Sequence, residues 1–362
     1  MSDEPTRRRF VAAAGTGVIG ATPGCLERLA DGDGGSDGAD TNTGPNDGED
    51  HATGKDEPAT ETGPDDVPGV DGGAVVFVYD DGPIEDYEVA YPVHREFDAP
   101  ATAGIVTEWI GRKDFQGTDW MDVDQIGELE AAGWEVASHT TAHTALGAFE
   151  LVEDAGPDDT RIYPERRHHG FHHGYEIEIT DGDDSVRRTV VGSDRDDVGG
   201  YLEFDEPLGT SFRAGDARER YPADVMREFL GESKRELEGR GFEIETLLAP
   251  YDIVDEWAVE IAREYYAGIA NVRPGSMVND PETFDPFETR RDYFIEFTTP
   301  DDVESALDRI AHEEALGVVG AHTFKEEVTG DRIRQTLEWI DERDLEVVTF
   351  RDAIEATVGG SG

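Results

Sequence analysis

From Ala74 onward, short apolar runs alternate with longer segments in which apolar residues recur at helical spacing. Short runs bounded by turn residues predict buried strands, and the longer period predicts amphipathic helices. The strands expected are Ala74–Tyr79, Ala101–Val106, Trp134–Ala137, Thr246–Tyr251, Ala267–Val272, Tyr293–Phe297, Gly317–Ala321 and Glu346–Phe350. The clearest helices expected are Asp122–Ala132, Ala223–Arg240, Pro300–Leu316 and Thr329–Arg343. Because strands and helices alternate, the pattern predicts an α/β fold with a parallel sheet, and about seven or eight such units favour a barrel.

One interval, from about Ala148 to Tyr221, breaks this rhythm. Within it, Tyr175–Thr180, Ser185–Val191 and Tyr201–Phe204 alternate apolar and polar residues. Strands of antiparallel sheets with one solvated face show this alternation. We therefore expect a β-rich insertion at about 148–221.

The N-terminal region has the pattern of an export signal followed by a linker. Three consecutive arginines precede the apolar run Val11–Thr22, which is shorter than the ~18 residues that a membrane-spanning helix needs. Residues 1–25 resemble a twin-arginine signal, and a disordered basic start is the alternative. Residues 26–73 are acidic and nearly devoid of apolar side chains, which predicts a disordered linker.

Cys25 follows Thr22, Pro23 and Gly24 in a run that resembles a lipobox. Lipidation at Cys25 would tether an exported protein to the extracellular face of the cell membrane. The alternative is a free cysteine in a signal that is cleaved elsewhere or not at all, with the protein secreted in the former case. Since Cys25 is the only cysteine, a disulfide within the chain and a cysteine-rich metal site are excluded, and any metal must bind histidine and carboxylate.

The charge of the chain is strongly negative, with 84 acidic residues against 31 basic ones and a net charge of −53. Such a surface repels nucleic acid and anionic membranes, so neither is an expected partner. The composition resembles that of proteins from salt-loving organisms, because a Debye length of about 3 Å in molar salt screens the repulsion between carboxylates. A calcium-binding coat is the alternative, although no loop with EF-hand spacing is present.

Candidate catalytic residues lie where three predicted strands end. Asp80 and Asp81 follow the first strand, His139 and His143 follow the third, and His322 follows the run 316–321. Barrel enzymes assemble their sites at this end of the strands, so the three signals reinforce one another. The i,i+4 spacing of the two histidines would let both rings reach one ion from a helical turn. Taken singly, an acidic turn, a histidine pair and a core histidine are each common in proteins without a site.

Taken together and in order, these motifs resemble those of the NodB-type polysaccharide deacetylases. The resemblance covers about Val75 to Ala356 and rests on Tyr79-Asp80-Asp81-Gly82, His139-x-x-x-His143, Leu248-Ala249-Pro250-Tyr251 and Ala321-His322. It implies a distorted (β/α) barrel of seven or eight units over residues 74–358. It also implies metal-dependent removal of acetyl groups from N-acetylated sugars.

The resemblance assigns a role to each matched residue. Asp81, His139 and His143 would bind a divalent metal, usually zinc in the family, with cobalt, manganese, iron or nickel as alternatives. Asp80 would accept the proton of the attacking water.

The third and last motifs would complete the catalytic machinery. The Tyr251 backbone N–H, beside Pro250, would face the developing oxyanion. His322 would protonate the leaving amine.

This chain departs from the family at two motifs. Leu248 stands where the family usually has an arginine that orients the catalytic aspartate, and leucine cannot form that ion pair. Arg273, Arg290 or Arg291 would enter the site instead, with a surface position as the alternative for each. The usual Asp-Trp motif is not recognisable, so His322 has no identified partner.

The insertion contains four histidines between His168 and His173. A second metal site or a substrate clamp is one interpretation of this run. The alternative that we favour is adventitious metal binding by a flexible loop. The insertion itself would then cover the rim of the barrel and narrow substrate choice. Phe171 and Tyr175 would either stack on sugar faces or fill the core of the insertion.

The function expected is that of an exported, metal-dependent deacetylase acting on an N-acetylated polysaccharide of the cell surface or the environment. A related hydrolase of a small linear amide and a non-catalytic glycan-binding protein on the same scaffold are the two alternatives. A base, three ligands and an acid together favour catalysis, since a lectin needs none of them.

Overall fold

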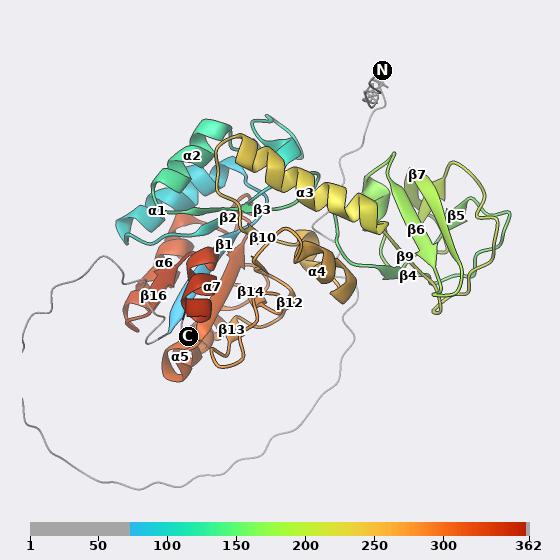
Figure 1. Ribbon diagram of the computed structural model, residues 1–362. Helices are drawn as coiled ribbons and strands as arrows, with labels where there is room; N and C mark the ends of the chain where they lie inside the picture. The colour runs from blue at the N-terminus through green and yellow to red at the C-terminus, as the bar shows by residue number, and fades with distance from the viewer. Residues whose placement is uncertain (1–72, 360–362) are drawn as a thin grey trace, which may run out of the picture. The chain divides into compact units, whose positions relative to one another are not determined.

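The computed structural model describes residues 73–359, and Figure 1 shows their arrangement. The expected signal at 1–25, Cys25, and the expected linker up to residue 72 lie outside the described residues. Among the residues described, no helix combines the length and the apolar character needed to cross a bilayer.

The main sheet has ten strands, and its central members are parallel. Its order is β11-β10-β3-β2-β1-β15-β14-β12, with β16 paired to β1 and β13 paired antiparallel to β15. The strands are β1 (Ala74–Tyr79), β2 (Thr102–Ile105), β3 (Glu135–Ser138), β10 (Thr246–Leu247), β11 (Gly268–Ile269), β12 (Arg273–Pro274), β13 (Val278–Asn279), β14 (Arg290–Tyr293), β15 (Leu316–Ala321) and β16 (Glu346–Val348). Within residues 73–359 no ladder joins β11 to β12, so the barrel is open there, which confirms the expected distorted barrel.

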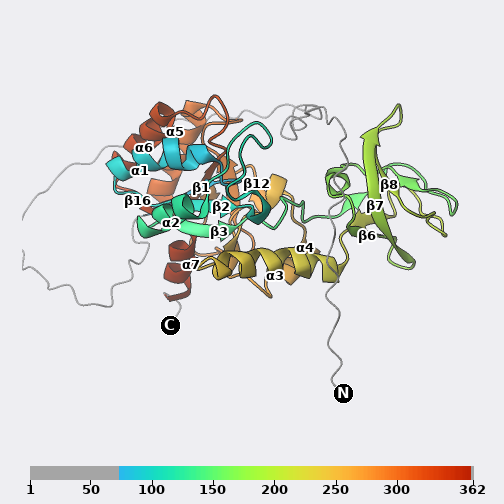
Figure 2. The ribbon, with the colours of Figure 1, turned by 90° about the horizontal axis from the view of Figure 1, so that it is seen from above.

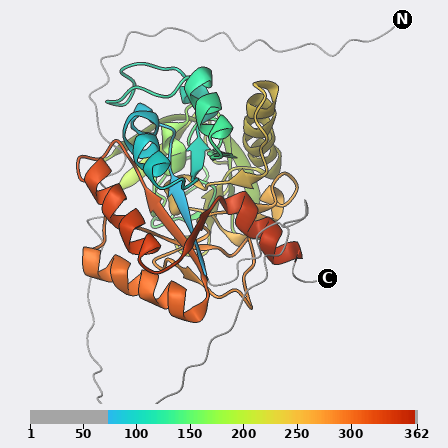
Figure 3. The ribbon, with the colours of Figure 1, turned by 90° about the vertical axis from the view of Figure 1, so that its left-hand side faces the viewer.

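Helices form an outer layer around the strands, as Figures 2 and 3 show. They are α1 (Tyr91–Glu96), α2 (Val123–Ala131), α3 (Ala223–Gly239), α4 (Glu256–Ala262), α5 (Pro300–Glu313), α6 (Gly330–Asp341) and α7 (Phe350–Gly359), with the short turns η2 (Asp86–Ala90), η3 (Thr107–Trp109) and η5 (Pro250–Asp252). Helix α5 begins as its sequence predicts, because the Thr299 side chain accepts a hydrogen bond from the Asp302 N–H and Pro300 occupies the first turn.

The two faces of β1 bury different apolar clusters. Val75, Phe77 and Tyr79 belong to the large cluster that includes helix side chains. Val76 and Val78 pack in a second cluster, whose members are Ala74, Ala137, Leu248, Ala270, Leu316, Val318, Phe350, Ala353 and Ile354. Successive side chains of a strand alternate between the two faces of the sheet. The packing of β1 therefore fixes which face each residue at its end points to.

Several expected boundaries were wrong, each for a local reason. The expected strand Tyr293–Phe297 is in fact Arg290–Tyr293, and Phe297 has a left-handed φ of 58° that no strand allows. The expected strand Thr246–Tyr251 ends at Leu247, because Pro250 opens a short helical turn in which Tyr251 has φ 62°. Helix α5 stops before the expected Leu316, since Glu314 has φ 51° and closes it.

Residues 149–220 contribute a separate antiparallel sheet with the order β4-β9-β6-β7-β8-β5. Its strands are β4 (Phe149–Glu150), β5 (Arg161–Ile162), β6 (Glu176–Thr180), β7 (Ser185–Arg195), β8 (Gly200–Phe204) and β9 (Arg218–Arg220). A short turn, η4 (His168–Phe171), carries the first part of the histidine run. Ile177, Ile179, Val190, Leu202 and Phe204 are buried, so the apolar positions of the alternating strands form the core expected of them.

Candidate functional site

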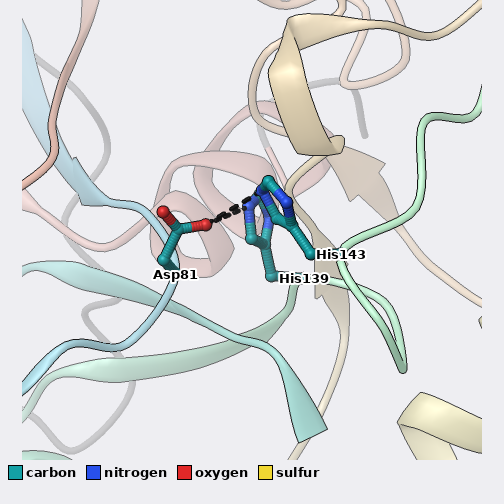
Figure 4. Close-up of side chains that lie close together, drawn as sticks. All are labelled: Asp81, His139 and His143. Carbon is teal, nitrogen blue, oxygen red and sulfur yellow. Dashed lines mark ion pairs between the residues drawn. The ribbon is translucent and has the colours of Figure 1, made fainter. Parts of the chain in front are cut away.

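Asp81, His139 and His143 converge at the ends of β1 and β3. One carboxylate oxygen, Asp81 Oδ1, lies 3.2 Å from His139 Nε2 and 3.0 Å from His143 Nε2, and Figure 4 shows the carboxylate pointing at both rings. All three side chains are buried. The histidines do not share a helical turn as expected, because Thr140 and His143 have left-handed φ values of 63° and 56°. That irregular turn brings the rings together.

The donor atoms of this cluster suit a divalent cation. The ring of His139 uses Nδ1 to donate to the Leu248 carbonyl at 3.0 Å, so in the neutral tautomer Nε2 presents a lone pair toward Asp81. Asp81 Oδ1 is buried and accepts no hydrogen bond. One ligand atom from each residue lies within 4.8 Å of the others. Two imidazole nitrogens and one carboxylate oxygen form a set that suits zinc and related divalent ions.

The electrostatics of the cluster favour an anionic Asp81 carboxylate. Burial raises the pKa of Asp81, but charged His143 and His139 more than offset this and lower it well below its usual range. Burial lowers the pKa of His143 despite the adjacent Asp81. A cation between these atoms would be held by the carboxylate and by the lone pairs of the two rings.

Asp80 lies beside a buried arginine. Arg291 Nη1 donates to both carboxylate oxygens of Asp80, at 2.8 and 2.6 Å, and both side chains are 2% exposed. Arg291 Nη2 bonds Asp252 Oδ1 at 2.6 Å and Tyr293 Oη at 3.0 Å. Burial lowers the pKa of Arg291, but the carboxylates of Asp252 and Asp80 raise it well above its usual value. One guanidinium therefore spans two carboxylates and orients Asp80.

Of the three arginines considered from the sequence, only Arg291 enters the site. Arg273 is exposed and pairs with Glu288 at 2.6 Å. Arg290 is also exposed. Arg273 and Arg290 line a surface hollow that contains none of the other candidate site residues. Leu248 is fully buried, and a Cβ at Gly104 would lie 2.7 Å from its Cδ2. The motif position is thus filled by apolar packing, and the ion pair comes from β14.

His322 has a carboxylate partner that the sequence did not reveal. Its Nδ1 lies 3.0 Å from Glu296 Oε1, its backbone N–H donates to the same oxygen at 3.1 Å, and its Nε2 is 3.8 Å from Asp80 Oδ2. Burial lowers the pKa of His322, but the hydrogen bond to Glu296 and the charges of Asp80 and Glu296 raise it to about 9. The only sequence signal for Glu296 was an acidic residue within an otherwise apolar predicted strand.

Pro250 and Tyr251 lie in the turn η5 next to the metal-site histidines. Pro250 is buried, and the Tyr251 ring centroid is 4.3 Å from that of His143. Asp252, which the sequence analysis missed, accepts from Asn271 Nδ2 at 2.8 Å and from the Tyr293 hydroxyl at 2.9 Å. The third motif therefore contributes a carboxylate that anchors Arg291.

The histidine run of the insertion does not form a second metal cluster. Among residues 73–359, the one group of three or more histidine, cysteine or acidic side chains with metal-binding spacing is Asp81, His139 and His143. His169 Nδ1 lies 2.7 Å from Glu219 Oε2 and its Nε2 lies 3.0 Å from the Ala145 carbonyl. Both ring nitrogens of His169 are therefore used in hydrogen bonds.

The two aromatic residues of the insertion differ in exposure. Tyr175 packs on Phe229 with ring centroids 4.7 Å apart, so it fills a core. Phe171 is 41% exposed.

Comparison with known proteins finds a match to the part of the chain that carries the first two motifs. Residues 69–167 match the family model described as polysaccharide deacetylase. The match includes Asp80, Asp81, His139 and His143, and it confirms the resemblance drawn from the motifs.

Among curated proteins, the poly-beta-1,6-N-acetyl-D-glucosamine N-deacetylase of Staphylococcus aureus strain MSSA476 is 33% identical over 63 residues. The aligned part covers 17% of this chain and 22% of that relative, so the chain spans about a fifth of its length.

Two solved structures are similar to this chain. The Xyl-CE4 domain of a multidomain xylanase from the hindgut metagenome of Trinervitermes trinervoides is 11% identical, with TM-score 0.41 over 80% of this chain and 92% of that one. A Streptococcus pyogenes deacetylase in complex with acetate is 17% identical, with TM-score 0.31 over 56% and 57% of the two chains.

Proposed function

We propose that this deacetylase-family protein is a metal-dependent hydrolase that removes N-acetyl groups from a polysaccharide and releases acetate. The observation that carries the proposal is the meeting of three parts at one rim of the sheet. These are the acceptor cluster at Asp81, the Asp80–Arg291 pair and the Glu296–His322 pair. Metal site, base and acid are the parts that hydrolysis of an amide requires.

Asp81, His139 and His143 would hold the ion. When bound, a divalent ion of this kind supplies Lewis acidity toward a carbonyl and lowers the pKa of water from 15.7 to about 7. Asp80 accepts the proton of the attacking water, and Arg291 keeps the Asp80 carboxylate oriented toward the rim.

His322 donates a proton to the leaving amine. Glu296 pairs with Nδ1 of His322, and the Nε2 atom of the same ring faces Asp80. A pKa of about 9 leaves His322 protonated at neutral pH, as a general acid must be. Base and acid are thus neighbours, with His322 Nε2 3.8 Å from Asp80 Oδ2.

The proposed substrate class is an N-acetylated glycan. Its support is the family match together with the name of the Staphylococcus aureus relative, whose substrate is a polymer of N-acetylglucosamine. We also propose that the protein is exported and anchored at Cys25, on the pattern of residues 1–25 alone.

The test is acetate release from N-acetylglucosamine polymers at high salt with added Zn²⁺ or Co²⁺. Asp80→Asn should lower the rate by roughly 10²- to 10⁴-fold, the usual contribution of a positioned base, and should still bind metal. Asp124→Asn, which changes an exposed aspartate of α2, is the matched control and should keep full activity. Polymer binding without acetate release by the metal-loaded wild type would refute the deacetylase assignment for these substrates.

A further inference from the structure

The turn η5 is conformationally strained. Tyr251 and Asp252 are consecutive non-glycine residues with φ 62° and 55°. Left-handed backbone at such residues costs about 1–3 kcal/mol each and persists only where surrounding contacts hold it. Contacts of the Tyr251 and Asp252 side chains must therefore hold the turn in this conformation.

On one side, the Asp252 carboxylate is held by the barrel. Arg291, Tyr293 and Asn271 donate to it at 2.6, 2.9 and 2.8 Å. These bonds also link the turn to Asp80, because Arg291 donates to both carboxylates.

On the other side, the Tyr251 ring lies between two imidazoles. Its centroid is 4.3 Å from that of His143, and 4.5 Å from that of His168. His168 belongs to the insertion, is 8% exposed and stacks on Phe149 at 5.7 Å with an interplanar angle of 27°. The Tyr251 ring thus links His168 of the insertion to the candidate metal ligand His143.

The position of His168 is fixed by its neighbour. His169 is fully buried and bonds the Ala145 carbonyl, two residues beyond His143, as well as Glu219 on β9. The turn η4 is therefore bound to the same segment that carries His143.

We propose that His168 is a positioning residue of the deacetylase site. Its ring packs at a tilt against Tyr251 and holds the strained turn η5 against His143. The proposal rests on the proposed function, since η5 carries the Tyr251 backbone N–H assigned to the oxyanion and the Asp252 anchor of Arg291. The insertion is then a structural part of the catalytic site as well as a cover over its rim.

The experiment compares His168→Leu, which keeps apolar bulk but lacks a flat ring, with His168→Phe, which keeps the ring and lacks the nitrogens. His173→Ala, which removes an exposed histidine of the same run, is the control. Hydrogen exchange of the metal-free protein over residues 248–254 reports on η5 independently of activity. Exchange there should rise in His168→Leu by roughly three- to tenfold, the factor that one aromatic ring pair supports, and return to the wild-type rate in His168→Phe.

Steady-state deacetylation supplies the second readout. In His168→Leu, kcat should fall by about tenfold, because small displacements of reacting groups are costly, while KM changes less than twofold. His168→Phe should recover kcat. Unchanged exchange and kcat in His168→Leu would overturn the proposal, as would a His168→Phe variant as impaired as His168→Leu. If even the wild type releases no acetate, the proposed function fails, whereas the exchange data still decide whether His168 holds η5.

Discussion

The barrel and the insertion each carry histidines in a short stretch of sequence, but only one group forms a convergent site. His139 and His143 are two histidines four residues apart, and both direct Nε2 at a single oxygen of Asp81. The run from His168 to His173 is denser, yet its members turn to different partners. His169 is bonded at both nitrogens, and His168 stacks on Phe149 and packs at a tilt against Tyr251.

The difference shows that density of histidines in sequence does not make a ligand set. Convergence requires a backbone that aims several lone pairs at one point, which Thr140 and His143 achieve with left-handed φ values. Each ligand nitrogen must also present a lone pair, as Nε2 of His139 does in the neutral tautomer whose Nδ1 donates to the Leu248 carbonyl. In the insertion, by contrast, both ring nitrogens of His169 are hydrogen-bonded, one to Glu219 and the other to the Ala145 carbonyl.

The sharpest test of this contrast is to remove one histidine from each group. Because zinc sites bind with about 10–16 kcal/mol shared among a few ligands, His139→Ala should lower Zn²⁺ affinity by about 10³-fold. His173→Ala should leave it within about twofold. Equilibrium dialysis at high salt and neutral pH measures both. Comparable losses in the two variants would show that the insertion contributes ligands.

The second prediction concerns the buried pair in the insertion. His169→Ala leaves the fully buried Glu219 carboxylate without its ring partner and removes the ring that packs on Tyr221 at 4.3 Å. Breaking a buried pair in this way costs about 3 kcal/mol or more of unfolding free energy. Denaturant unfolding of the metal-free protein measures it. His139→Ala is the matched comparison, and a larger stability loss there than in His169→Ala would reverse the roles of the two groups.

Much of the barrel was predictable because its signals are local. The apolar run of β1 and the Thr299-Pro300 start of α5 are both read from adjacent residues, and both were confirmed. The strand expected at Tyr293–Phe297 was displaced because its end depends on the left-handed Phe297. Nothing in the hydrophobic pattern encodes that φ value.

The site residues that could be predicted are those that directly follow a strand. The order of motifs was enough to bring Asp81, His139 and His143 together. Arg291 could not be separated from Arg290, since neighbours on a strand differ only in the face they occupy. Glu296 lies 26 residues before His322, so the pair exists only because β14 and β15 are adjacent. Contacts that depend on strand order require the folded chain.

His322 offers the third and smallest test, because it stands between the two kinds of histidine compared above. Like His169 it pairs with a buried carboxylate, but its second nitrogen lies 3.8 Å from Asp80. Burial lowers the pKa of His322, and the bond to Glu296 and the charge of Asp80 raise it to about 9. The acid form is lost as pH rises through that value, so kcat/KM should decline there.

Glu296→Gln keeps an acceptor for Nδ1 but removes the charge, so it should lower the pKa of His322 by about one unit or more. The alkaline limb of the pH–rate profile should then move down by the same amount, while Glu236→Gln, which changes an exposed glutamate of α3, should leave it in place. The raised pKa also stabilises the fold below the unfolded value of about 6.5, and that contribution is lost as pH rises through about 9. Unfolding free energy measured from pH 6 to 10 should therefore fall less steeply in Glu296→Gln. If the alkaline limb of the pH–rate profile stays near pH 9 in Glu296→Gln, the limb reports a group other than His322. His322 would then have a purely structural role, as His169 does.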